Sequence, residues 1–289
     1  MNDVTRVSPG DDASRHDNGS HILTALYRAR RFNLWMGDTL RPYLGQRILE
    51  VGAGIGSLTR QFIPRELYVA SDVNPDYLRH LRAFADGKSY LRVMELDAGD
   101  RRCFRDLANR FDTVLMLNVL EHLPDEGASL GNVWSALSPG GRAIVLVPQH
   151  PALYGTLDAA LAHRERYTEA GLRRALTGAG FRIETVFDFN RFSVPGWWVN
   201  GKVLRRRRFS RVQLALIDVL MPLLRRIDHL WPWGGISLVG VGVKDAAVGD
   251  HRGASAASTT SVTGGGTHAS TTTNAKRAGT RMADHPGTT

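Results

Sequence analysis

Apolar runs and amphipathic stretches alternate along the first half of the chain. The apolar runs predict buried strands at residues 47–51, 67–72, 90–96, 111–117 and 142–147. The stretches before and between them predict helices at residues 29–43, 57–63, 75–85, 101–109 and 126–137. The sequence Ser138-Pro139-Gly140-Gly141 is typical of a turn that ends a helix. Continuous apolar strands that alternate with helices predict a parallel sheet covered on both faces, which is an α/β fold.

The pattern changes after the fifth strand. A predicted helix at 168–177 leads into a predicted strand at 181–187, and a last strand is predicted at 236–243. Between these two strands lies a segment, residues 190–232, that is too long for an ordinary connection. It contains an amphipathic helix at 212–226, so we interpret it as a helical insertion that shapes a substrate site or docks a partner.

The two ends of the chain differ in composition from its middle. Residues 1–20 are polar and lack the apolar core of a signal peptide, so we expect a flexible leader. Residues 244–289 contain no Leu, Ile, Phe, Tyr, Trp or Cys, and we expect them to be disordered because they cannot bury enough apolar surface. The folded domain is therefore predicted at residues 21–243. The single cysteine, Cys103, excludes an intramolecular disulfide, and we expect a cytoplasmic protein.

Positive charge is concentrated in the predicted insertion. The chain has a net charge of +9, and residues 202–226 hold +7 of it, with Asp218 as their single acid. A protein-wide argument for nucleic-acid binding therefore fails. The segment is either a solvated face or a helix on a membrane surface, since its leucines are flanked by arginines and Trp231 and Trp233 lie nearby. Nucleic-acid binding is the least favoured interpretation, because aromatic residues at base-stacking spacing are lacking.

A glycine-rich loop follows the first predicted strand. The segment Glu50-Val51-Gly52-Ala53-Gly54-Ile55-Gly56-Ser57 joins this strand to a predicted helix. Glycine permits a sharp turn and the close approach of a ligand, and this position in an α/β sheet binds nucleotides. A dinucleotide fingerprint has glycine at its first, third and sixth positions, whereas the sixth position here is Ser57. Glu50 would repel a pyrophosphate but attract an ammonium group, so the pattern favours a cofactor with an amino-acid tail over NAD.

Polar residues also follow the next three strands. Asp72 ends the second strand, 22 positions after Glu50, where a carboxylate accepts hydrogen bonds from ribose hydroxyls. Asp97 and Ala98 follow the third strand, where a carboxylate can accept from an adenine amino group, and Asn118 ends the fourth. Carboxyl ends of parallel strands meet at one edge, so we expect these residues to line one crevice. Alternatively, Glu50 and Asp72 only organise the loop and Asp97 caps a helix.

Five motifs in this order resemble the class I S-adenosylmethionine-dependent methyltransferases, over roughly residues 46–187. The motifs are the loop 50–56, Ala70-Ser71-Asp72, Leu96-Asp97-Ala98, residues 111–124 with Asn118 and Glu121-His122-Leu123-Pro124, and residues 137–141. The resemblance implies a Rossmann-like, doubly wound seven-stranded sheet whose last strand is antiparallel. It implies S-adenosylmethionine as the cofactor. Residues around Gln149-His150-Pro151 and Gly196-Trp197-Trp198 are similar to a bacterial group of these enzymes associated with small molecules and glycans.

The resemblance also implies a role for each residue of the crevice. The loop would cradle the methionine part, Glu50 would lie near its ammonium group, Asp72 would hold the ribose, and Asp97 would bind the adenine amine. The implied cofactor-binding residues are Glu50, Gly52, Ala53, Gly54, Gly56, Asp72, Asp97, Ala98 and Asn118.

Methyl transfer from a sulfonium mainly requires proximity and orientation, and a general base helps when the acceptor is a hydroxyl. The candidate bases are His122, His150 and His163, each of which is alternatively a packing residue. Asp158 is a further candidate that alternatively caps a helix. Trp35, in the first predicted helix, is interpreted as a packing residue. No metal site is predicted.

The expected function is methyl transfer to an oxygen of a small molecule or a lipid-linked glycan. The expected partners are this acceptor and, through residues 202–233, a membrane surface. Two alternatives stay open: a non-catalytic binding or scaffold protein that keeps the fold, and an NAD-dependent oxidoreductase, which Ser57 disfavours.

Overall fold

The computed structural model describes residues 29–206 and 211–245. The predicted leader, Arg207 and Arg208 of the basic run, and all but two residues of the predicted tail lie outside these ranges. The chain divides into a unit Met1–Ala247 and a unit Val248–Thr289, and every described residue belongs to the first.

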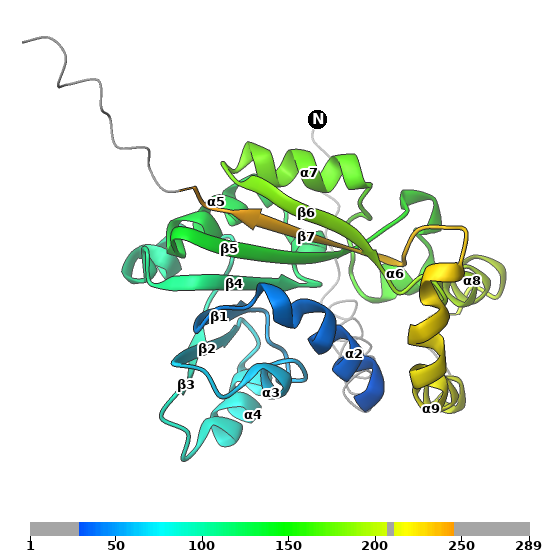
Figure 1. The fold of residues 1–289 in the computed structure, drawn as a ribbon, viewed down its shortest axis with the longest axis horizontal. Coiled ribbons are helices and arrows are strands. Elements are labelled where there is room, and N and C mark those ends of the chain that lie inside the picture. The colour runs from blue at the N-terminus through cyan, green and yellow to red at the C-terminus, as the bar shows by residue number, and fades with distance from the viewer. Residues whose placement is uncertain (1–28, 207–210, 246–289) are drawn as a thin grey trace, which may run out of the picture. The chain divides into compact units, whose positions relative to one another are not determined.

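One seven-stranded sheet, in the order β3-β2-β1-β4-β5-β7-β6, forms the centre of the described unit (Figure 1). The strands are β1 (Arg47–Val51), β2 (Leu67–Asp72), β3 (Leu91–Glu95), β4 (Phe111–Leu117), β5 (Leu137–Pro148), β6 (Arg182–Phe189) and β7 (Ser237–Val243). The first five strands pair in parallel, while β7 is antiparallel to both β5 and β6. The prediction of a Rossmann-like sheet with an antiparallel last strand is confirmed.

Helices surround this sheet. They are α2 (Arg30–Leu40), α3 (Thr59–Phe62), α4 (Pro75–Ala85), α5 (Glu126–Ala136), α6 (Thr156–Ala160), α7 (Glu169–Gly178), α8 (Ser193–Trp198) and α9 (Arg211–Ile227). Successive residues of β4 alternate between the faces: Val114 and Met116 pack in a core with α5 and α7, and Leu115 packs in a core with α2, α3 and α4. Burial on both faces explains the continuous apolar runs of the central strands.

Four predicted boundaries are wrong. The helix predicted at 57–63 is the single turn α3, because the glycine loop turns continue to Leu58. The helix predicted at 101–109 is a 3-10 segment, Arg101–Leu107, which Asp100 caps. The turn predicted at 138–141 is instead the start of β5. The domain also extends past residue 243, since the buried Lys244 donates from Nζ to Asn109 Oδ1 and to two backbone carbonyls.

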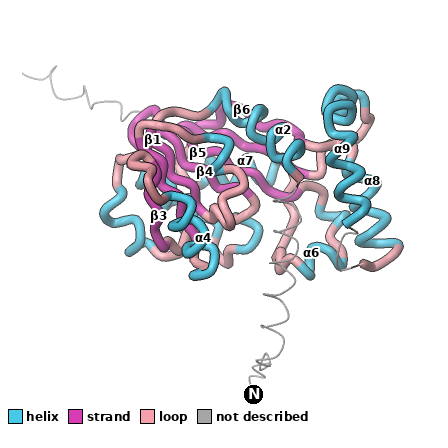
Figure 2. Tube along the Cα trace, turned by 90° about the horizontal axis from the view of Figure 1, so that it is seen from below, coloured by secondary structure: helices cyan, strands magenta, loops and turns pink. Residues whose placement is uncertain are grey.

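The insertion between β6 and β7 is helical, as predicted. It contains α8, a π-helical turn Val199–Val203, α9 and a 3-10 turn Asp228–Leu230. Figure 2 shows α8 and α9 side by side, outside the sheet. Asp218 joins α9 to α2, because its Oδ1 accepts from the backbone N–H groups of Arg31 and Phe32 at 2.9 and 3.2 Å, in the first turn of α2.

Aromatic packing joins α2 to the insertion. The Trp35 ring lies 4.4 Å from the Phe189 ring and 6.0 Å from the Phe192 ring, so the interpretation of Trp35 as a packing residue is confirmed. Within the described ranges, no helix is both long enough and apolar enough to span a bilayer.

Candidate functional site

The glycine loop after β1 leaves space beside its backbone. Gly52, Gly54 and Gly56 all have positive φ, a conformation that L side chains rarely adopt. A Cβ on Gly52 would overlap Val119 Cγ2, so this glycine is needed for packing beneath the loop. A Cβ on Gly54 would meet no atom within 4 Å. Gly54 therefore borders open space, as a cradle for a ligand requires.

Asp72 connects the end of β2 to this loop. Its Oδ2 accepts from the Gly54 N–H at 2.8 Å, and its Oδ1 accepts from the Asn74 N–H at 2.9 Å. The Ala53 N–H donates to Ser71 O at 2.8 Å beside it. Asp72 thus organises the loop, as the alternative interpretation holds. Each carboxylate oxygen can accept more than one hydrogen bond, so this role leaves room for a ribose hydroxyl.

Glu50 lies beneath the loop and is buried. Its Oε2 accepts from Thr59 Oγ1 at 2.5 Å and from Tyr68 OH at 2.8 Å. Burial raises the pKa of Glu50 to about 7. The two hydrogen bonds oppose this rise, and the Asp72 charge adds to it. A cation bound above the loop would favour the ionised form of Glu50. The Glu50 carboxyl group beneath the loop therefore fits a ligand that carries an ammonium group.

The remaining predicted cofactor residues follow β3 and β4. Asp97 is exposed, and its Oδ1 accepts from the Gly99 N–H at 2.8 Å, while Ala98 is buried. Asn118 is exposed in the left-handed conformation and donates its N–H to Leu146 O at 2.8 Å. Because β3, β2, β1 and β4 are neighbours in that order, these residues and the loop share one edge of the sheet. We call this the cofactor edge.

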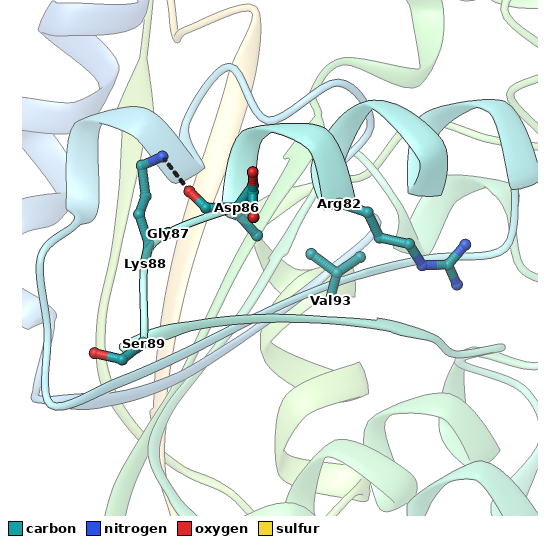
Figure 3. Close-up of a pocket in the computed structure, with 7 residues that line it drawn as sticks. Arg82, Asp86, Gly87, Lys88, Ser89 and Val93 are labelled. Atoms are coloured by element: carbon teal, nitrogen blue, oxygen red, sulfur yellow. Dashed lines mark hydrogen bonds between the residues drawn. The ribbon is translucent and has the colours of Figure 1, made fainter.

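A shallow depression elsewhere does not belong to the cofactor edge. It is lined by Arg82, Asp86, Gly87, Lys88, Ser89 and Val93 (Figure 3). The turn that forms it leads into the amino end of β3, so it lies at the opposite edge of the sheet.

Two histidines and a buried glutamate form a cluster after β4. Glu121 is 1% exposed, and neither of its carboxylate oxygens has a hydrogen-bond partner. His163 Nε2 lies 3.8 Å from Glu121 Oε1, and the His122 and His163 rings are 5.0 Å apart. One ligand-type atom from each residue lies within 4.8 Å of those of the other two. The structure thus brings together two of the three predicted histidines, together with a glutamate that was not predicted as a site residue.

The cluster has unusual protonation properties. Burial raises the pKa of Glu121 to about 8, with Asp158 adding to the rise and Arg166 opposing it. Burial, and then the neighbouring His163 ring, lower the pKa of His122 to about 4. His122 is therefore neutral at pH 7 and has little tendency to take up a proton there.

Asp158 orients His163. Its Oδ1 accepts from Arg166 Nε at 2.7 Å and lies 3.1 Å from His163 Nδ1. Its Oδ2 accepts from the Gly155 N–H at 3.0 Å and from Trp197 Nε1 at 3.3 Å. Burial alone would raise the pKa of Asp158, but His163 and Arg166 together lower it. Asp158 is thus a carboxylate paired on both oxygens, and its bond to the Gly155 N–H at the start of α6 confirms the alternative interpretation as a helix cap. It acts as a positioning residue for His163.

His150 lies apart from this cluster, at the end of β5. Its backbone is left-handed, and its buried Nε2 has no hydrogen-bond partner. Gln149 Oε1 and Asn190 Oδ1 are also buried and unpaired. The Gln149 N–H donates to Ile236 O at 2.8 Å and the Ile236 N–H to Asn190 O at 3.0 Å, so the three unpaired atoms belong to adjoining chain segments. We call Gln149, His150 and Asn190 the polar edge.

Sequence reasoning missed Glu121, Gln149 and Asn190 as site residues. Glu121 directly precedes His122 in the fourth motif, and this pairing was an available signal. Gln149 entered the sequence analysis only through a resemblance, and position 190 only as the start of the insertion. A buried polar atom without a partner is visible only in three dimensions.

The comparisons with known proteins agree with this geometry. A family model described as a methyltransferase domain matches residues 49–143, from β1 to β5. This segment is a methyltransferase domain. Together with the fold, the match implies S-adenosylmethionine as the cofactor.

Relatives match only in part. The highly reducing polyketide synthase ctvA of Aspergillus terreus is 29% identical over 150 residues, which are 47% of this chain and 6% of that protein. The ubiquinone biosynthesis O-methyltransferase of Aeromonas salmonicida is 27% identical over 124 residues, which are 42% of this chain and 51% of that enzyme. The chain therefore spans about half the length of this O-methyltransferase and a far smaller part of the synthase.

A solved structure extends the likeness in fold. The [4+2]-cyclase SpnF matches with a TM-score of 0.51 and 16% identity, over 73% of this chain and 81% of that chain. Because that protein is a cyclase, the fold by itself does not determine the reaction.

Proposed function

We propose that the protein transfers a methyl group from S-adenosylmethionine to an oxygen atom of a small molecule or a lipid-linked glycan. The supporting observation is the polar edge, where Gln149 Oε1, His150 Nε2 and Asn190 Oδ1 are buried without hydrogen-bond partners. Such atoms are costly in a folded protein unless water or a ligand pairs with them. An acceptor that carries several hydroxyl groups supplies the missing partners.

The position of the polar edge suits an acceptor site. In the sheet, β5 is separated from β1 by β4 alone, which corresponds to about 10 Å between the strand that precedes the glycine loop and the strand that precedes His150. Both strands end at the same edge because β1, β4 and β5 are parallel. An acceptor at the polar edge is therefore within reach of a methyl group held over β4.

His150 is the residue best placed to receive the acceptor proton. When bound, S-adenosylmethionine supplies a methyl group activated by its sulfonium. As the oxygen–carbon bond forms and the sulfur–carbon bond breaks, the hydroxyl proton must leave. His150 Nε2 has no partner in the protein and accepts this proton when the ring is the neutral Nδ1–H tautomer. His122 is less suited, since burial and His163 lower its pKa to about 4. In His163, Nδ1 already faces Asp158.

Binding and turnover test this proposal separately. Calorimetry with S-adenosylhomocysteine, with NAD as the comparison ligand, measures whether the cofactor edge binds its ligand. Mass spectrometry and NMR of products from sugars and polyprenyl-linked glycans then show whether a methyl group is transferred and to which atom. We expect His150→Gln to lower kcat at least about tenfold with unchanged S-adenosylhomocysteine binding, whereas His80→Gln, an exposed change on α4, leaves both unchanged.

Each other outcome has a defined meaning. Binding of S-adenosylhomocysteine without transfer to any acceptor supports the non-catalytic alternative. Binding of NAD without a response to S-adenosylhomocysteine supports the oxidoreductase. Methyl transfer to a carbon atom refutes the proposed O-methylation, and with it the role of His150 as acceptor of a hydroxyl proton.

We further propose that α9 places this site on an anionic membrane surface. Its residues Val212, Leu216, Val219 and Leu223 are 76%, 57%, 60% and 58% exposed. They recur at helical spacing and form one apolar stripe that faces away from the protein. The exposed Arg226 follows at the end of the helix. An apolar stripe next to cationic side chains is typical of helices that lie in the interface of anionic bilayers.

The opposite side of α9 packs on the protein, which leaves this apolar stripe exposed to solvent. Met221 is buried, Leu214 and Leu224 are half-buried, and Asp218 bonds to α2. Leu214 and Leu224 were predicted as part of the membrane-facing set, and they lie on the protein side instead. The rings of Trp231 and Trp233 contact each other in a tilted arrangement, with centroids 5.0 Å apart.

A further inference from the structure

We propose that Glu121, His122 and His163 bind a divalent transition-metal ion such as Zn²⁺, Fe²⁺ or Co²⁺. The inference rests on the geometry of these three side chains and is independent of the reaction proposed above. Two imidazoles and one carboxylate form a common ligand set for such ions, and they leave further coordination positions open.

The carboxylate of Glu121 lacks any other partner. The residue is 1% exposed, and both of its carboxyl oxygens are buried without a hydrogen bond. A buried carboxylate without a partner is strongly unfavourable, and buried charges in proteins are normally paired or bound to metals. Arg166, the nearby cation, donates instead to Asp158 and to Gln149 O. A metal ion would give Glu121 the partner that its own surroundings do not.

Both histidines hold their free nitrogen toward the cluster. His163 Nδ1 lies 3.1 Å from Asp158 Oδ1, which also accepts from Arg166 Nε, so Nδ1 is the ring nitrogen that donates. His122 Nδ1 lies 3.2 Å from Ala162 O, which is also only an acceptor. In the neutral form of either ring, Nε2 then carries the lone pair and can serve as a ligand. A carboxylate or carbonyl behind each ring is the usual outer arrangement of metal-binding histidines.

The distances are close to those of a formed site. The three ligand atoms lie within 4.8 Å of one another, and His163 Nε2 is 3.8 Å from Glu121 Oε1. Tetrahedral ligands at about 2.1 Å from a zinc ion are about 3.4 Å apart, so closure needs movements of about 1 Å. The loop that holds His163 is fixed to the cluster, because the Arg164 N–H donates to Glu121 O at 2.9 Å.

The chemistry of the ligands also predicts selectivity. Imidazole nitrogen favours Zn²⁺, Co²⁺ and Fe²⁺ over Mg²⁺ and Ca²⁺, which prefer oxygen ligands. We therefore expect Mg²⁺ to compete poorly. This selectivity separates a built metal site from general attraction of cations to carboxylates.

The test is a Co²⁺ titration of the untagged full chain after removal of metal with EDTA. Bound Co²⁺ is followed by its visible ligand-field absorption, which also reports the coordination geometry, and Zn²⁺ is used to displace it. The chain has 10 histidines in all, several of them outside the described ranges, so variants must identify the site. The variants are Glu121→Gln, His122→Gln and the matched control His80→Gln.

We expect one tightly bound Co²⁺ per chain, displaced by Zn²⁺ but not by equimolar Mg²⁺. Glu121→Gln and His122→Gln should each weaken binding at least about tenfold, and His80→Gln should leave it unchanged. His122 is the least buried of the three, so His122→Gln is the safer variant if Glu121→Gln folds poorly. Wild-type protein without a tight Co²⁺ site, or tight binding that survives His122→Gln, overturns the proposal. Neither result depends on S-adenosylhomocysteine binding or on turnover.

Discussion

Replacing Glu50 by glutamine should stabilise the protein above neutral pH and change its stability much less in mild acid. Glu50 is buried beneath the glycine loop, where only Thr59 and Tyr68 donate to Oε2. Burial raises its pKa from 4.5 to about 7. The native state therefore holds the Glu50 proton over a pH range in which the unfolded chain has already released it. Glutamine has a similar shape and no proton to release.

The magnitude follows from this difference in pKa. Below pH 4.5 both states are protonated, and ionisation of Glu50 does not affect folding. Between 4.5 and about 7 the unfolded state ionises first, so the free energy of unfolding falls by up to about 1.4 kcal/mol per pH unit. From about pH 5 to about pH 8 the accumulated loss is about 2 to 3 kcal/mol. The stability of Glu50→Gln relative to wild type should therefore rise by that amount over this range.

Urea unfolding of both proteins across this pH range measures the difference directly. Subtracting the wild-type curve from the variant curve removes the contribution of the other ionisable groups. Glu95→Gln, an exposed change on β3, serves as the control and should show no comparable trend. A difference that does not change with pH refutes the argument from burial. A wild type that gains stability over the variant as the pH rises refutes it more strongly, because native Glu50 would then ionise readily.

Three further predictions concern the other surfaces of the molecule. Gly54→Val should abolish S-adenosylhomocysteine binding in calorimetry. The control Gly87→Val replaces a glycine with a similar positive φ and equally open space, so it should lower stability by a similar amount and leave binding intact. Loss of binding in both variants contradicts the assignment of the loop. Asp158→Asn should weaken Co²⁺ binding by about 10- to 100-fold, because it removes the carboxylate that fixes the His163 tautomer; an unchanged affinity would show that Asp158 does not orient a ligand. Leu223→Ser should reduce flotation with phosphatidylglycerol vesicles, whereas the exposed Leu230→Ser, outside α9, should not; equal flotation of both excludes the apolar stripe as the contact.

The fold could be predicted from the sequence wherever a local pattern determines it. The bounds predicted for β1, β2 and β4 agree with the structure, because each of these strands is a continuous apolar run followed by a polar or glycine-rich turn. The prediction failed where neighbouring elements decide the conformation. Residues 138–141 have the composition of a turn, yet they extend β5 because Gly141 accepts from and Gly140 donates to the backbone of Lys244, far along the chain.

The same distinction applies to the site. The cofactor edge was predictable, since each of its residues directly follows a strand and parallel strands bring their carboxyl ends together. The environment of Asp158 was not, because its partners Arg166 and Trp197 come from a loop and from the insertion. Residue type alone allowed a base at this position. Only the complete set of donors shows an ionised carboxylate with no free oxygen.

The turn after β4 connects the two proposed functions of this edge. Asn118 opens the turn beside the predicted cofactor residues, and Glu121 and His122 close it within the metal-ligand cluster. A backbone bond from Arg164 to Glu121 O holds the His163 loop against the same turn. A metal ion at the cluster would share no ligand with the cofactor edge or with the polar edge. This separation is why metal affinity, S-adenosylhomocysteine affinity and methyl transfer can be changed one at a time by His122→Gln, Gly54→Val and His150→Gln.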